Sequence, residues 1–162
     1  EMCGVTYPSG STLMRVGVDS CAAVSVLPRS VWTDYPMGPK DSRVRSSYRC
    51  ASGKMMKDEG KRFIEGDIEG LTKPFWGGFR VTAATRPLMA VSDLVDHDAR
   101  VICEKVNGQD SSHLVIKRTG QKVRLPRTKG VYDMYMKVRP YKKSTLKKKL
   151  EGATFHGQGR GL

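Results

Sequence analysis

The chain has 162 residues, 38% of them hydrophobic, and it carries 29 Lys and Arg against 16 Asp and Glu, a formal net charge of +13. This length fits one domain or a small domain with a tail, and it excludes two large domains. No run of about 18 apolar residues occurs, and residues 1–25 lack the basic start and apolar block of a signal peptide. We therefore expect no membrane association, no secretion, and a cytoplasmic or intracellular-particle location. The start at Glu1 suggests a piece of a longer chain or a processed product.

The excess of positive charge is confined to the later part of the chain. Residues 1–116 hold 15 Lys and Arg against 14 Asp and Glu, whereas residues 117–149 hold 13 against Asp133 alone. Such a block attracts polyanions through counterion release, so a nucleic acid is a candidate partner. The alternative is a solvated tail without a partner.

In chain order, short β-branched runs alternate with turn residues, which is typical of an all-β fold. The runs expected to form strands are residues 13–18, 23–27, 63–68, 75–83, 100–104, 113–117, 122–125 and 130–136. Turn signals lie at residues 36–39, 52–53, 77–78, 107–108 and 119–120. Residues 28–32, which begin with a proline, and residues 89–96 could each form a short helix.

Composition changes at residue 138, where a Lys-rich segment is followed by a Gly-rich end. We place a domain boundary there and expect disorder for most of residues 138–162. The lysines that would contact a nucleic acid in this tail are Lys142, Lys143, Lys147, Lys148 and Lys149.

The segment from residue 13 to residue 28 contains the pattern of greatest chemical interest. Two apolar runs flank Asp19, Ser20, Cys21 and Ala22. A carboxylate on a tight turn, a hydroxyl beside it and small residues behind it would allow two such turns to meet. This is the composition of one half of an aspartic-protease site, except that such turns usually carry glycine where this chain has Cys21.

Three segments in this order resemble the retropepsin-like aspartic proteases of retrotransposon polyproteins, more narrowly the copia-type arrangement. They are residues 16–23 as the catalytic turn, residues 49–54 as the start of a flap hairpin, and residues 87–94 as the element that follows in that family. The resemblance implies a half-barrel fold with extra C-terminal strands. It predicts an N-terminal extension at 1–12, a protease domain at 13–94, a pre-integrase-like β segment at 95–137 packed on it or following it, and a basic tail at 138–162.

The resemblance also implies an endopeptidase that hydrolyses peptide bonds of its own polyprotein by activating a water. Two carboxyl groups close together would share one proton, because neighbouring groups that carry the same charge cannot both ionise. The chain has one such turn, so the second Asp19 would come from another copy in a two-fold homodimer. Ser20 would hold the partner turn, and Ala51, Ser52 and Gly53 would belong to a flap over the peptide substrate.

Cys21 is the departure from the family pattern that bears on activity. A left-handed backbone at this position would favour glycine, and a cysteine there would add strain of order 1–2 kcal/mol. We expect a small, buried and inert thiol. A catalytically degenerate domain that serves as a spacer or dimer module is therefore an alternative to the active enzyme.

Metal and cofactor sites are not indicated by the sequence. Cys3, Cys21, Cys50 and Cys103 form no Cys-x-x-Cys pair, and reduced thiols are expected. Glu65, Asp67 and Glu69 alternate along one strand, and a solvated strand face is favoured there over a cation site. We expect no cofactor.

Overall fold

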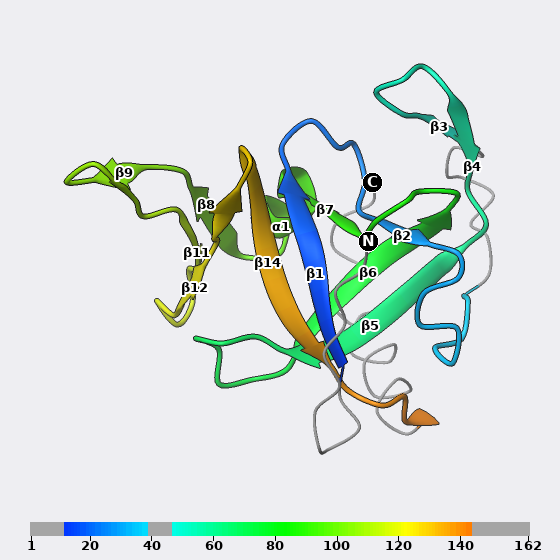
Figure 1. The fold of residues 1–162 in the computed structure, drawn as a ribbon. Coiled ribbons are helices and arrows are strands. Elements are labelled where there is room, and N and C mark those ends of the chain that lie inside the picture. The colour runs from blue at the N-terminus through cyan, green and yellow to red at the C-terminus, as the bar shows by residue number, and fades with distance from the viewer. Residues whose placement is uncertain (1–11, 39–46, 144–162) are drawn as a thin grey trace.

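The computed structural model describes residues 12–38 and 47–143, and these form an all-β fold with a single short helix among them (Figure 1). The strands and helix in chain order are β1 (Thr12–Asp19), β2 (Val26–Pro28), β3 (Ser47–Arg49), β4 (Met55–Lys57), β5 (Lys61–Asp67), β6 (Phe75–Thr82), β7 (Leu88–Ala90), α1 (Val91–Asp96), β8 (Ala99–Ile102), β9 (Lys105–Val106), β10 (Gln109–Asp110), β11 (His113–Ile116), β12 (Lys122–Arg124), β13 (Arg127–Thr128) and β14 (Val131–Val138). No helix in the described part is long and apolar enough to cross a membrane.

The main sheet closes on itself. Its strand order is β1-β7-β2-β6-β5-β14-β13, and β14 also pairs with β1. The β1–β14 pairing is antiparallel and runs from Thr12↔Val138 to Val18↔Tyr132, so it is the longest register of the fold. On its other edge β1 pairs in parallel with β7. Only Gly17 and Val18 of β1 are therefore paired on both edges, just before Asp19.

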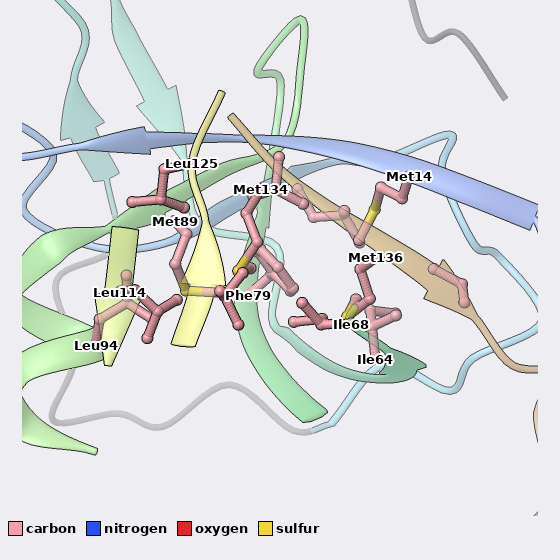
Figure 2. Packing of buried hydrophobic residues seen from close by; sticks show 14 of the residues in the cluster. Met14, Ile64, Ile68, Phe79, Met89, Leu94, Leu114, Leu125, Met134 and Met136 are labelled. Atoms are coloured by element: carbon pink, nitrogen blue, oxygen red, sulfur yellow. The ribbon is translucent and has the colours of Figure 1, made fainter. Parts of the chain in front are cut away.

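Alternation along the strands explains which side chains fill this barrel. In β14, Met134 and Met136 are fully buried whereas Tyr135 between them is exposed, as the two-residue period of a strand requires. In β1, Met14 and Val16 follow the same period. Figure 2 shows these methionines packed beside Ile64 and Phe79 of β5 and β6.

A second, three-stranded sheet of order β12-β11-β8 lies beside the barrel (Figure 1). Leu114 of this sheet and Leu125, which directly follows β12, belong to the same buried cluster as Met89 and Leu94, so the two sheets share one core (Figure 2). Residues 95–137, expected as a β segment packed on the preceding domain or following it, therefore contribute to that core. Their last part forms most of β14, which is a strand of the main barrel.

Two local expectations from the sequence differ from the structure. Gly77 and Gly78 lie inside β6 instead of forming a turn. A Cβ on Gly77 would come within 2.5 Å of the Phe79 ring, so the glycine is needed for packing. Residues 28–32 form no helix; Pro28 ends β2 and Trp32 has a φ of 55° in the following turn.

Other turns and the short helix are where the sequence placed them. Gly53, Asn107, Gly108 and Gly120 have positive φ at the predicted turns. Residues 91–96 form α1, within the predicted range.

The basic tail was expected to begin at residue 138, but the described residues there pack on the body. Val138 ends β14, and the Arg139 guanidinium donates two hydrogen bonds to the Asp67 carboxylate at 2.8 and 2.7 Å. The Tyr35 hydroxyl donates to the Arg139 carbonyl oxygen at 2.6 Å, and the Tyr141 ring lies 5.4 Å from the Tyr35 ring. Arg139 and Tyr141 therefore belong to the folded body.

Candidate active site

Asp19 is the last residue of β1 and opens a tight turn. Strand β1 pairs there in parallel with β7, with Asp19 beside Ala90. One oxygen of the Asp19 carboxylate, Oδ1, accepts a hydrogen bond from the backbone N–H of Cys21 at 2.8 Å. This bond fixes the carboxylate on its own turn, while the turn remains open to solvent: Asp19 is half-buried, and Ser20 and Cys21 are exposed.

The approach of β1 to β7 depends on Gly17, two residues before Asp19. A Cβ there would lie 2.8 Å from a methyl group of Leu88. The Gly17 N–H donates to the Pro87 carbonyl oxygen at 3.1 Å. The small residue thus lets the strand that carries Asp19 pack closely against the strand that leads into α1.

Cys21 differs from its expectation in two respects. The non-glycine residues with positive φ in the described part are Trp32, Asp98, Asn107 and Lys129, so Cys21 carries no left-handed strain. Its side chain is exposed, whereas the sequence predicted a buried thiol. Its contribution to the turn is made by the backbone N–H, which any residue except proline would supply.

A buried hydroxyl network connects the end of this turn to α1. Ser25 is 1% exposed, and its hydroxyl lies 2.6 Å from the Asp93 carboxylate oxygen Oδ2 and accepts the Ala90 N–H at 2.9 Å. The Ser25 N–H donates to the same Asp93 oxygen at 3.0 Å. Sequence reasoning missed this pair because its members lie 68 positions apart, although the Ser and Asp both stood within recognised segments.

The hairpin formed by β3 and β4 contains the residues expected in a flap. Ala51, Ser52 and Gly53 form its exposed tip, where the Gly53 N–H donates to the Cys50 carbonyl oxygen at 2.8 Å. In Figure 1 this hairpin projects from the barrel at the upper end, the end to which β1 also points. A hydrogen bond from Ser52 lowers the pKa of the Cys50 thiol at the same tip.

The base of the hairpin is anchored by a buried carboxylate. Asp58 is 4% exposed and accepts hydrogen bonds from the Tyr48 hydroxyl at 3.2 Å and from the Gly60 N–H at 2.9 Å. Its second oxygen also lies 3.7 Å from Arg80. The tip is therefore exposed and lightly held while the base is fixed, which is the arrangement a covering loop requires.

Two carboxylates of β5, Glu65 and Asp67, form ion pairs with Arg139. Besides Asp67, the Glu65 carboxylate lies 3.6 Å from Arg139, and Glu65 is only 7% exposed. These carboxylates hold the pKa of Arg139 above its ordinary value, chiefly through the hydrogen bond with Asp67. The solvated face expected here thus applies to Glu69, which is exposed. The described residues contain no cluster of three or more side chains that could hold a metal ion.

The remaining predicted residues are distributed as follows. Ala22 is half-buried in the turn, beside Cys21. Lys142 and Lys143 are exposed, and Lys147, Lys148 and Lys149 lie outside the described residues. Comparison of the chain with protein-family models, curated proteins and solved structures gives no match.

Proposed function

We propose that this chain is one half of an aspartic endopeptidase that acts as a two-fold homodimer. The observation that carries the proposal is the Asp19 turn: a carboxylate at the end of a rigid strand, oriented by the Cys21 N–H at 2.8 Å and open to solvent. The same patch on two copies can meet across a two-fold axis, which brings the two carboxylates together. The β3–β4 hairpin would cover a bound peptide and exclude water.

The retropepsin-like half-barrel remains part of this proposal. The closed sheet, the turn at the end of its first strand and the projecting hairpin support it. Gly17 and the Ser25–Asp93 pair support it further, because they fix the two strands on which the turn is mounted. Asp19 is the catalytic residue in this proposal, and Ser20 and Ala22 shape the surface on which the partner turn rests.

The reaction follows from two carboxyl groups that share one proton. The ionised group takes a proton from a water molecule as the water oxygen bonds to the peptide carbonyl carbon, and the protonated group gives its proton to the carbonyl oxygen. In the second step one hydroxyl of the diol returns a proton to the now ionised carboxylate, and the other carboxyl protonates the amine nitrogen as the C–N bond breaks. The pair is restored, and it titrates as a unit.

The proposal predicts cleavage that is favoured by acid and lost in Asp19→Asn. An asparagine keeps the size of the side chain but cannot accept a proton from water. The assay is cleavage of a mixed peptide library by the full chain, with pepstatin-like inhibition as a second readout. Asp34→Asn is the matched control, because Asp34 is an exposed carboxylate elsewhere on the surface. Equal cleavage by wild type and Asp19→Asn would contradict the proposal.

The exposed thiol favours one second candidate, a degenerate dimer module without activity. Cys21 places a side chain on the surface at which the two turns would meet. Cleavage that appears only in Cys21→Gly supports the degenerate module, and cleavage by the wild-type chain supports the enzyme. Both candidates require the homodimer.

A further inference from the structure

The three-stranded sheet of β8, β11 and β12 has an outward face that the proposed peptidase does not use. Its inward face is formed by Leu114 and Val123, both buried in the common core. Residues paired directly across antiparallel strands point to the same side. The pairings Val115↔Arg100, Val115↔Lys122, His113↔Ile102 and His113↔Arg124 therefore place these six residues on the outward face.

This face carries basic residues without acidic ones. Arg100, Lys122 and Arg124 are exposed, and none of them has a carboxylate partner among the residues that the structure describes. Strand geometry sets Lys122 and Arg124 about 7 Å apart along β12, and Arg100 about 10 Å from Lys122 across β11. The three basic side chains thus start from fixed positions on one face of the sheet.

Few carboxylates lie near this sheet in the sequence, and most of them form ion pairs with other residues. Residues 97–130 hold eight Lys and Arg against Asp98, Glu104 and Asp110. Asp98 lies 3.3 Å from Arg118, and Asp110 lies 3.9 Å from Arg127. Glu104 is the remaining one and follows β8 by two positions. Of the six Lys and Arg that remain besides Arg118 and Arg127, three lie on the outward face: Arg100, Lys122 and Arg124.

We propose that this outward face binds the phosphate backbone of a nucleic acid. A nucleic acid has the high linear charge density that gains most from releasing counterions to a row of fixed cations. The centre of the face is formed by Val115, Ile102 and His113, and the face has no Phe, Tyr or Trp ring on which a base could stack. The His113 ring is already held by a hydrogen bond between its Nδ1 and the Ser111 carbonyl oxygen, at 2.8 Å. Binding therefore depends on phosphates and does not distinguish sequences.

This proposal places the nucleic-acid contact on a folded surface, whereas the sequence alone predicts it at the C-terminal lysines. Arg100 lies outside the basic block at residues 117–149, so sequence charge alone did not include it. The fold brings it into line with Lys122 through the central strand β11. The proposal is independent of Asp19 and of the peptidase.

The test measures binding of the full chain to a fluorescent 20-base-pair duplex DNA across a range of salt concentrations. The face variant carries Arg100→Gln, Lys122→Gln and Arg124→Gln. The control carries Lys54→Gln, Lys57→Gln and Lys73→Gln, three exposed lysines elsewhere, and so loses the same net charge. Circular dichroism confirms that each variant is folded.

We expect the face variant to lower the slope of log affinity against log salt by about 2–3, since each lost phosphate contact removes about 0.9. The control should lower it much less. Equal effects of the two variants would overturn the proposal. So would a face variant that binds like wild type while replacement of Lys142, Lys143, Lys147, Lys148 and Lys149 by Gln abolishes binding. A polyglutamate peptide of equal charge that binds as tightly as the duplex would assign the face to acidic proteins instead.

Discussion

At the scale of single residues, Cys21 contributes to the turn at Asp19 through its backbone and not through its side chain. The Cys21 N–H orients the carboxylate, and its backbone is not left-handed, so glycine has no conformational advantage there. Retropepsin-like proteases usually have glycine where this chain has Cys21, but the cysteine causes no backbone strain in the single chain. Its effect is confined to the surface that a second copy would meet.

The Cys21→Gly variant tests this reading of the turn. We expect the free energy of unfolding to change by less than about 1 kcal/mol, the usual entropic cost of an added glycine. Urea unfolding of the two chains at low protein concentration measures it. A stabilisation of about 1–2 kcal/mol would instead show that Cys21 is strained.

Tyr35 gives a prediction about alkaline pH. Burial raises the pKa of its hydroxyl from 10.0 to about 12. The unfolded chain therefore loses this proton first, and stability that is fully present below pH 10 is lost as pH rises toward 12. In Tyr35→Phe this component is absent, so its stability should fall less than that of wild type between about pH 9 and pH 11. Urea unfolding at the two pH values tests this, with the exposed Tyr135→Phe as control. Parallel losses in wild type and Tyr35→Phe would contradict it.

At the scale of elements, α1 depends on a partner outside itself. It has six residues and no side-chain cap, and an isolated helix of this length is unstable in water. The buried Ser25 hydroxyl lies 2.6 Å from Asp93 and accepts the N–H of Ala90, the residue that precedes the helix. The network joins the segment after the Asp19 turn to the helix that follows β7.

Ser25→Ala should therefore destabilise the protein by about 1–3 kcal/mol, because it leaves the buried Ala90 N–H without its acceptor. The measurement is the midpoint of urea unfolding. Ser92→Ala, on an exposed position of α1, is the control and should change stability by less than about 0.5 kcal/mol. A Ser25→Ala chain as stable as this control would show that the network is not needed.

The long strands and the short strands β8, β11 and β12 could be predicted from sequence, whereas other short strands could not. β1, β5, β6 and β14 have enough β-branched or alternating residues to be recognised. β7 and β13 have three and two residues and exist only because neighbouring strands pair with them. The Asp19 turn was found because its residues are adjacent, whereas the Ser25–Asp93 pair and the Arg139–Asp67 pair needed the fold to bring them together.

At the scale of the whole molecule, the first and last strands of the described chain pair with each other and close the main sheet. β14 pairs with β1 along seven positions and with β5 at Lys137 and Val138. Its buried methionines also fill the barrel. The segment up to residue 94 therefore lacks one wall of its own core.

A fragment of residues 12–94 should consequently fail to fold, while residues 12–143 should unfold cooperatively. Removing β14 exposes the edge of β1 and the apolar side chains beneath it. Thermal unfolding followed by circular dichroism distinguishes the two outcomes. A cooperative transition in the 12–94 fragment would show that β14 is an addition to a complete domain.

The central claim is that two copies of Asp19 form one site, and mixing experiments test it most directly. Wild-type and Asp19→Asn chains are mixed in equal amounts at constant total concentration and allowed to exchange partners, and peptide cleavage is measured. If both carboxylates are required, the rate falls to about a quarter of the wild-type value, since about one dimer in four then has two intact turns. A fall to about a half would mean that each chain acts by itself, and it would contradict the shared site.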